Sequence, residues 1–191
     1  MPRLFSGIEV PADIAQRLCT LRGGLEQARW IDPENYHVTL RFIGDVDGVT
    51  AERFDDALSK IKSLPFDLTL EGLGVFGRKK PRAVWAGVQP NSVLDALFRA
   101  NDLAAQNAGL APEGRNFHPH VTLARLRGAK SATVAGYLAH NGAFASSPFT
   151  VSRFVLFSAR ESRGGGPYIV ERSYPLGQAA QSPLELVEPG E

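Results

Sequence analysis

The sequence contains almost no cysteine and no long apolar segment. Cys19 is the only cysteine among 191 residues, which excludes a disulfide within the chain and a zinc site built from cysteines. No stretch approaches the roughly 20 apolar residues of a membrane-spanning helix, and the first residues, MPRLFSGIEVPAD, lack the apolar core of a signal peptide. These absences predict a cytoplasmic protein that neither enters nor crosses a membrane.

Neither sign of charge dominates the composition. The chain has 21 basic and 20 acidic residues and is 43% hydrophobic, values typical of a soluble globular protein. The densest basic cluster is Arg78–Arg82 (RKKPR), and Arg125, Arg127 and Lys130 form a looser one. Either cluster could meet a phosphate backbone, and for the first cluster a solvated loop is an equally good interpretation.

Signatures of several common enzyme classes are missing. There is no G-x-S-x-G sequence and no P-loop, so nothing supports a serine esterase or a nucleoside triphosphatase. The letters of Gly72-x-Gly74-x-x-Gly77 match a dinucleotide-binding fingerprint, but that fingerprint needs a helix that starts inside it. Here the basic cluster leads into another predicted strand, so the match is coincidental.

Apolar periodicity and turn residues predict alternating strands and helices. Strands are expected at residues 4–10, 36–42, 66–75, 83–88, 120–126, 149–159 and 168–174, and helices at 11–22, 50–63, 92–108 and 131–139. Many strands are joined by short turns as antiparallel neighbours, and the helices are long enough to cover one sheet face, which indicates an α+β fold. We expect one domain over residues 1–176, a flexible tail over 177–191, and a monomer.

One tetrapeptide occurs twice in the chain. Residues 37–40 and 120–123 both read HVTL and start 83 residues apart, in a chain that has only four histidines. Such a repeat suggests two related lobes. Because side chains alternate along a strand, His37, Thr39 and Arg41 are expected on one face of the first strand.

In the second copy, His118, His120 and Thr122 share the polar face. A pseudo-twofold relation between the strands would place two imidazoles and two hydroxyls around one small ligand. Histidine has an unperturbed pKa near ~6.5, so one ring can remove a proton while the other supplies one. Threonine hydroxyls can donate hydrogen bonds to phosphoryl oxygens. The pattern therefore predicts phosphodiester hydrolysis.

The residues around both motifs carry a family resemblance. The segments ENYHVTLRFIG (34–44) and FHPHVTLAR (117–125), with RLF (3–5) before them and the 149–174 hairpin after them, resemble 2H phosphoesterases. The type is the bacterial and archaeal RNA 2′,3′-cyclic phosphodiesterase, historically called 2′-5′ RNA ligase, and the resemblance covers nearly the whole ordered chain. It implies a bilobal fold of two antiparallel sheets facing a central cleft, with helices outside and no metal or other cofactor. It also implies that RNA ends or nucleotides bearing a 2′,3′-cyclic phosphate are opened to leave a 2′-phosphate.

The same resemblance implies roles for five residues. His37 would be the proton donor and His120 the proton acceptor, and the near-identical motifs leave the reverse assignment open. Thr39 and Thr122 would bind the phosphate, and Arg125 would contact the phosphate or a nucleobase. Strict alternation points Arg125 away from His120, so its role requires a β-bulge or the end of the strand.

Three further points stay open at the level of sequence. Phe5 and Phe42 are candidates to stack on a base, but alternation turns Phe42 toward the core. His37, His118 and His120 could instead hold a zinc ion that activates water, or the protein could bind RNA phosphate ends without turnover. Ligation of 2′-5′ bonds is the reverse of the same displacement, with a ribose hydroxyl in place of water.

Overall fold

The computed structural model describes residues 3–159 and 165–177, and its fold is α+β as predicted. Its elements are β1 (Arg3–Glu9), α1 (Ala12–Cys19), β2 (Ala28–Trp30), the 3-10 helix η1 (Pro33–Asn35), β3 (His37–Asp45), α2 (Gly48–Ser59), β4 (Phe66–Leu68), β5 (Leu70–Phe76), β6 (Ala83–Val88), α3 (Ser92–Asn107), β7 (His120–Leu126), α4 (Ser131–Asn141), β8 (Phe149–Val151), β9 (Arg153–Ser158) and β10 (Ile169–Pro175). Strands β6 and β7 have the predicted bounds. Within the described ranges, every helix is too short or too polar to span a membrane.

Most of the strands belong to one curved antiparallel sheet. Its order is β10-β9-β1-β3-β7-β6-β5, with β2 paired to β7, while β4 and β8 form a separate two-stranded sheet. The two sheets implied by the resemblance join between β3 and β7 through a single residue pair, Val38 and Val121. The two copies of HVTL therefore lie on adjacent strands at the centre of the molecule.

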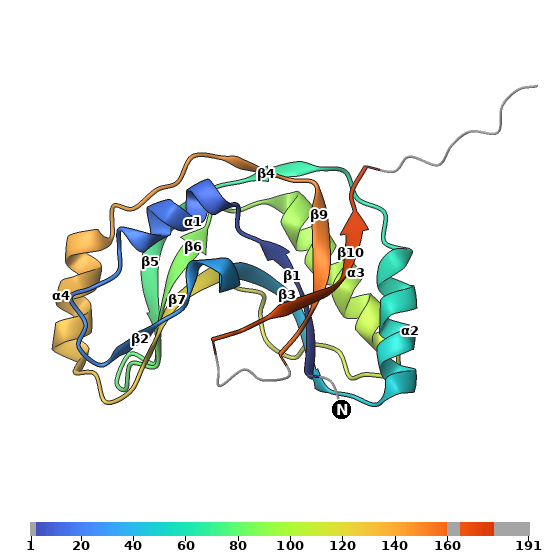
Figure 1. Cartoon of the computed structure of the whole chain (residues 1–191), viewed down its shortest axis with the longest axis horizontal. Coiled ribbons are helices and arrows are strands. Elements are labelled where there is room, and N and C mark those ends of the chain that lie inside the picture. Colours follow the sequence, from blue (N-terminus) through green and yellow to red (C-terminus); the bar gives the residue numbers. More distant parts are fainter. Residues whose placement is uncertain (1–2, 160–164, 178–191) are drawn as a thin grey trace, which may run out of the picture.

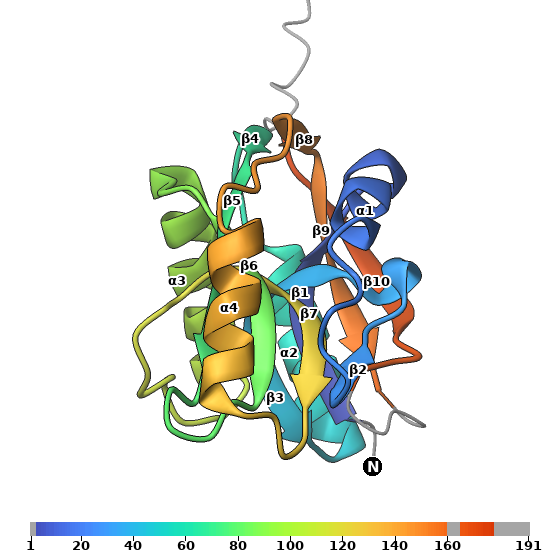
Figure 2. The same ribbon diagram turned by 90° about the vertical axis from the view of Figure 1, so that its left-hand side faces the viewer.

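The sheet and its helices form an arch (Figure 1). Helices α2 and α3 lie outside the half that contains β1 and β3, and α4 lies outside the other half. The turned view in Figure 2 shows β4 and β8 together at one end, opposite the open side of the arch. The central strands thus face a concave side that the helices leave uncovered.

Specific polar contacts start the longer helices and fix one of them to the sheet. The side chain of Asp47 accepts a hydrogen bond from the Thr50 N–H at the start of α2 (2.7 Å), and Asn91 caps α3 in the same way. Asn101 of α3 is fully buried and accepts a hydrogen bond from the Ser6 hydroxyl of β1 (2.6 Å). This contact holds α3 against the strand that pairs with β3.

Several predicted bounds differ from the structure. The strand predicted at 36–42 continues to Asp45, and the helix predicted at 50–63 is Gly48–Ser59. The first helix ends at Cys19 rather than at residue 22, and the next residues form a turn. The strands predicted at 66–75 and 149–159 each divide in two, because β4 and β8 pair with each other outside the main sheet. The predicted tail lies outside the described residues apart from Gly177, whose N–H donates to the Ser63 carbonyl (2.9 Å).

Two of the glycines that match the dinucleotide-binding fingerprint, Gly74 and Gly77, have structural roles in the β5–β6 hairpin. Gly77 has φ of +82° in the connecting turn, a conformation that favours glycine. Gly74 lies directly under the indole of Trp85, and a Cβ at this position would overlap the ring. The absence of a side chain therefore lets Trp85 lie flat across the neighbouring strand.

Gly74→Ala is expected to destabilise the protein because Trp85 must leave its position to accommodate the methyl group. We expect a loss of about 1–3 kcal/mol in the free energy of unfolding, the usual range for overpacking, measured by urea denaturation. Gly136→Ala in α4 is the matched control, since a Cβ there meets no atom within 4 Å and alanine favours a helix. Equal stability of the two variants would contradict this packing role.

Candidate active site

A β-bulge in β7 brings Arg125 to the same face as the catalytic candidates. Thr122 pairs with Trp85 of β6 and Ala124 pairs with Val84, so Leu123 is an extra residue without an opposite partner. One extra residue shifts the alternation of side chains by one position. Arg125 is consequently exposed on the concave side. Its predicted role required a β-bulge or the end of the strand, and the bulge at Leu123 meets this requirement.

Strand β3 carries a bulge at the equivalent position of its own motif. Thr39 pairs with Gly7 of β1 and Arg41 pairs with Ser6, so the extra residue is Leu40. The predicted orientations of Arg41 and Phe42 were therefore wrong. Arg41 is buried on the helix side of the sheet, and Phe42 is on the concave face with 41% of its surface exposed.

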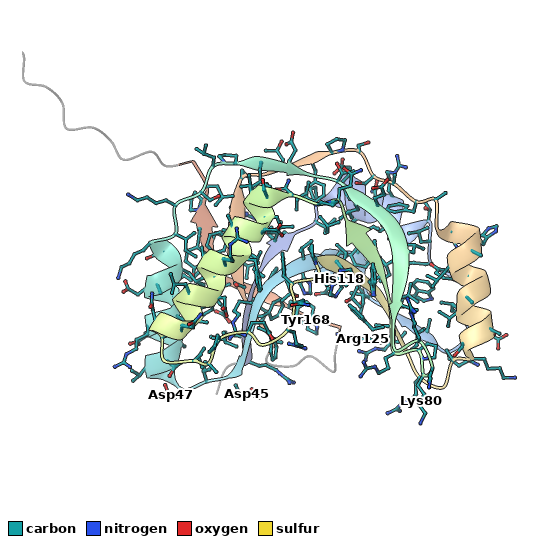
Figure 3. All side chains as sticks on the ribbon, turned by 180° about the vertical axis from the view of Figure 1, so that it is seen from behind. Asp45, Asp47, Lys80, His118, Arg125 and Tyr168 are labelled. Carbon is teal, nitrogen blue, oxygen red and sulfur yellow. The ribbon has the colours of Figure 1, made fainter. Side chains whose placement is uncertain are left out.

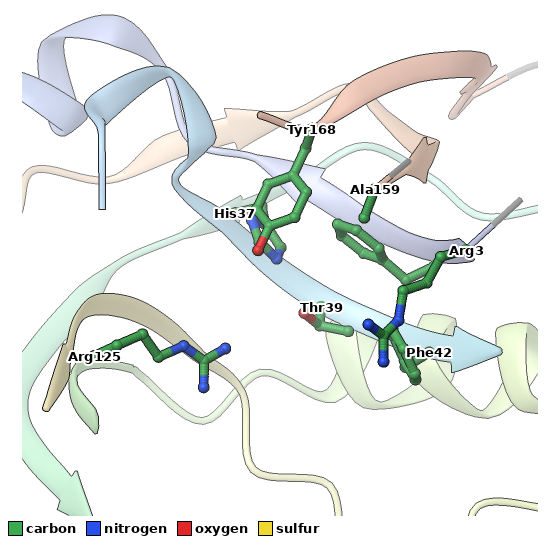
Figure 4. A pocket seen from close by; sticks show the side chains of 8 residues that line it. Arg3, His37, Thr39, Phe42, Arg125, Ala159 and Tyr168 are labelled. Carbon is green, nitrogen blue, oxygen red and sulfur yellow. The ribbon is translucent and has the colours of Figure 1, made fainter. Parts of the chain in front are cut away.

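The structure brings all five predicted site residues together. One cavity of about 130 Å³ is lined by His37, Thr39, His120, Thr122 and Arg125, together with Ile31, Asn35, Phe76 and Tyr168. A second cavity of about 260 Å³ shares His37, Thr39, Arg125 and Tyr168 and extends to Arg3, Phe5, Phe42 and Ala159 (Figure 4). The residues of both motif copies thus surround one continuous concave site.

Both histidines are held in the same tautomer. The Nδ1 atom of His37 lies 2.7 Å from the carbonyl oxygen of Asn35, and Nδ1 of His120 lies 2.7 Å from that of His118. A carbonyl oxygen only accepts hydrogen bonds, so each Nδ1 must carry the hydrogen. In each neutral ring Nε2 is then the free acceptor, available to take a proton from a ligand or from water.

Burial lowers the pKa of both histidines. The pKa of His37 falls to about 4, chiefly because the ring is enclosed, and the positive charges of His120 and Arg125 add to the effect. Burial also lowers the pKa of His120, with further contributions from His118 and Arg125. Both rings are therefore neutral in the free protein near pH 7, and an anionic ligand would raise both values.

Aromatic rings enclose His37 and His120 in similar ways. The ring centroid of His37 lies 4.9 Å from Phe5 and 5.1 Å from Tyr168. His120 lies 4.8 Å from Phe76 on the other half of the sheet. These apolar walls are the physical source of the lowered pKa values.

Lowering the pH is expected to destabilise the fold through His37. Its pKa of about 4 in the folded protein is below the ordinary value of 6.5, so between these values the unfolded chain binds more protons. The free energy of unfolding should therefore fall by at most ~3 kcal/mol from this group as the pH drops from about 6.5 to about 4. Urea denaturation across this range measures the slope, and His37→Gln should reduce it. An equal slope in both proteins would assign the effect to other groups.

His118 does not join the two central histidines in one cluster. Its ring packs edge-on against Trp85 at 4.7 Å and lies 6.1 Å from the ring of His120. Throughout residues 3–159 and 165–177, no three His, Cys, Asp or Glu side chains form a group that could hold a metal ion. The structure thus gives no support to the three-histidine zinc site.

Asn35 and Tyr168 help to position His37, although neither was predicted as a site residue. The Asn35 carbonyl holds His37, while its side-chain oxygen accepts a hydrogen bond from the Tyr168 N–H (3.0 Å). Tyr168 in turn places its ring edge-on to His37, and Figures 3 and 4 show it on the concave side with Arg125. Asn35 precedes the first motif by two residues, as His118 precedes the second, and this parallel was the available signal. Nothing in the sequence distinguished Tyr168 from an ordinary strand residue.

Comparison with known proteins agrees with this geometry. The family model described as LigT like Phosphoesterase matches residues 8–85 and 88–168, and each stretch contains one copy of HVTL. The chain belongs to this family.

Relatives of the phosphoesterase family match along much of the chain. The RNA 2′,3′-cyclic phosphodiesterase of Escherichia coli strain K12 is 31% identical over 180 residues, covering 92% of this chain and 97% of that protein. The protein of the same name from Aeropyrum pernix is 38% identical over 123 residues, covering 60% and 69%. The structure of E. coli LigT complexed with 3′-AMP superposes with a TM-score of 0.73 at 29% identity, covering 93% of this chain and all of that one. The family resemblance and the fold that it implied are confirmed.

Proposed function

We propose that this phosphoesterase opens terminal 2′,3′-cyclic phosphates of RNA or nucleotides to 2′-phosphates, without a metal ion. The observation that carries the proposal is the matched pair of imidazoles, His37 and His120, each presenting a free Nε2 to one cavity. Thr39 and Thr122 supply hydroxyl groups to the same cavity. The names of the curated relatives and the 3′-AMP bound to E. coli LigT support a nucleotide substrate.

The proposed step transfers one proton at each end of a displacement at phosphorus. His120 takes a proton from water through Nε2, and the water oxygen forms a bond to phosphorus. The bond between phosphorus and the 3′-oxygen breaks, and protonated His37 donates its proton to that oxygen. The products are a 3′-hydroxyl and a 2′-phosphate, and exchange with solvent returns both histidines to their starting states.

The threonines and Arg125 would act on the charge of the phosphoryl group. Hydroxyl hydrogens of Thr39 and Thr122 donate to the two non-bridging oxygens, where negative charge accumulates in the transition state. The Arg125 guanidinium lines both cavities and carries the opposite charge. This arrangement requires no ion from solution.

The difference in burial supports His37 as the proton donor. Burial penalises an imidazolium, so His37 is a stronger acid than an exposed histidine once it is protonated. The negative charge of a bound cyclic phosphate would raise the pKa of His37 and thereby favour its protonated form. His120 is less enclosed and lies nearer to solvent, which suits a ring that activates water.

The test is turnover of an oligonucleotide ending in adenosine 2′,3′-cyclic phosphate in excess EDTA. Chromatography that resolves 2′-phosphate from 3′-phosphate products should show the 2′-phosphate. Activity that requires added zinc would instead support the three-histidine metal site, and tight binding without turnover would support an RNA-end binder. An added ribose hydroxyl acceptor in the same assay tests ligation as the reverse displacement.

A further inference from the structure

The two basic clusters seen in the sequence meet in the folded protein. The Leu126 N–H donates to the Arg82 carbonyl (2.8 Å), and the Ser131 hydroxyl contacts the carbonyl oxygens of Arg78 (3.1 Å) and Lys79 (3.2 Å). These contacts join the β5–β6 turn to the end of β7. The combined surface, called here the basic rim, consists of Arg78, Lys79, Lys80, Arg82, Arg125, Arg127 and Lys130.

The positive charge of the basic rim is not neutralised locally. All seven side chains are exposed, and residues 77–82 and 125–131 include no acid. In the part of the chain that the structure describes, none of the seven forms an ion pair. A surface of this kind attracts a polyanion and raises its local concentration.

The basic rim is continuous with the active site. A cavity of about 550 Å³ is lined by Arg82 and Arg125 of the rim and by His118 and His120 near the site. Arg115 and Asn116 add further polar groups to it. Figure 3 shows Lys80 and Arg125 on the open side of the arch. The same cavity is also lined by Glu113 and by apolar side chains such as Phe76 and Phe117, and it connects His120 to the rim.

The turn that carries most of the rim is held in place before any ligand binds. Gly77 adopts a positive φ, and any Cβ there would overlap the carbonyl oxygen of Lys80. The Ser131 hydroxyl fixes the backbone of the same turn. Because the backbone of this turn is already ordered, the protein would lose little conformational entropy when a ligand binds to it.

We propose that the basic rim binds the phosphodiester backbone of RNA on the 5′ side of the terminal cyclic phosphate. This inference rests on the proposed function, since it assumes that the cyclic phosphate sits between the two histidines. A cyclic phosphate ends the 3′ side of a strand, so the remaining nucleotides must leave the site in one direction. The rim reaches the site through Arg125, which lines the cavities around both His37 and His120. The preferred substrate is then an oligoribonucleotide rather than a free cyclic nucleotide.

The test compares two substrates in one double variant, Lys79→Gln with Lys80→Gln. For an oligonucleotide ending in a 2′,3′-cyclic phosphate, kcat/KM should fall roughly fivefold to tenfold at low salt, mostly through KM. For adenosine 2′,3′-cyclic phosphate, kcat/KM should stay within about twofold, because this ligand has no second phosphate to reach the rim. The slope of log KM against log salt should decrease by about 1.4, the value for two lost contacts with a single strand.

The matched control removes two positive charges elsewhere. Lys60 and Lys62 are exposed and follow the end of α2. Helix α2 lies outside the other half of the arch. Lys60→Gln with Lys62→Gln should leave both substrates unchanged. An equal loss in this control would show that net charge alone is responsible and would overturn the proposal.

Other outcomes separate failure of this inference from failure of the proposed function. A wild-type protein that hydrolyses both substrates equally well, or a rim variant that affects both equally, would overturn the rim proposal alone. If the wild type hydrolyses neither, the proposed function fails, and anisotropy with a labelled oligonucleotide then tests the rim directly. Binding to phosphatidylserine vesicles with no binding to the oligonucleotide would identify a different partner and also overturn the inference.

Discussion

Replacing either His37 or His120 with alanine is expected to lower kcat on a 2′,3′-cyclic phosphate by about 10²–10⁴-fold. Each variant keeps the other imidazole, the threonines and Arg125, so substrate still binds and KM should change far less. Single-turnover rates in EDTA measure the effect. His140→Ala, at the exposed end of α4, is the control and should retain full activity. A variant at position 37 or 120 with wild-type kcat would contradict the two-histidine mechanism.

A substrate with sulfur at the 3′ position separates the two roles. A thiol has a pKa near ~8.5 and leaves as a thiolate without a proton donor, whereas a ribose alkoxide needs one. If His37 is the donor, His37→Ala should recover most of its lost rate on the 3′-thio cyclic substrate, and His120→Ala should not. Recovery in His120→Ala alone would reverse the assignment and leave the rest of the mechanism intact.

Arg41→Ala is expected to cost about 3–5 kcal/mol of folding stability, as when one partner of a buried ion pair is removed. The Arg41 side chain is 9% exposed, with Nε 2.9 Å from Oδ1 of Asp102 and Nη1 3.4 Å from Oε2 of Glu113. It also donates to the carbonyls of Phe42 and Ala111. Without the guanidinium, two largely buried carboxylates would lose their shared counter-charge.

Arg115→Ala is the matched control for this effect. Arg115 pairs with the same Glu113, but its side chain is 83% exposed, so its loss should cost no more than about 1 kcal/mol. Urea denaturation of both variants gives the comparison. Similar stabilities for the two would mean that burial of Arg41 adds nothing to its ion pairs.

The sequence predicted a strand or a site well where a single local pattern of residues defined it. Strands β6 and β7 had the predicted bounds because β6 is a short apolar run and β7 a short alternation of polar and apolar residues, each between turn residues. The duplicated motif located the site because its polar side chains share one face. The segments around β4 and β8 were predicted less well, since pairing with a distant strand divided them and local pattern does not encode that partner.

The orientation of Arg41 and Phe42 was predicted wrongly for a different reason. A bulge changes which face a residue takes, and HVTL has no glycine or proline to mark it. Only Arg125 hinted at it, because its expected role was incompatible with strict alternation. Applying that requirement to both copies of the motif would have placed Phe42 on the concave face as well.

The matched bulges also give the cleft a polarity. Two identical motifs on adjacent strands would accept a phosphodiester in either of two opposite orientations, with the histidines exchanging parts. The fifth residue after each histidine removes this degeneracy, because Phe42 occupies one side and Arg125 the other. An aromatic ring and a cation discriminate between the two ends of an asymmetric ligand. Under the proposed function, the pseudosymmetric pair of motifs would therefore bind an asymmetric phosphodiester in one orientation.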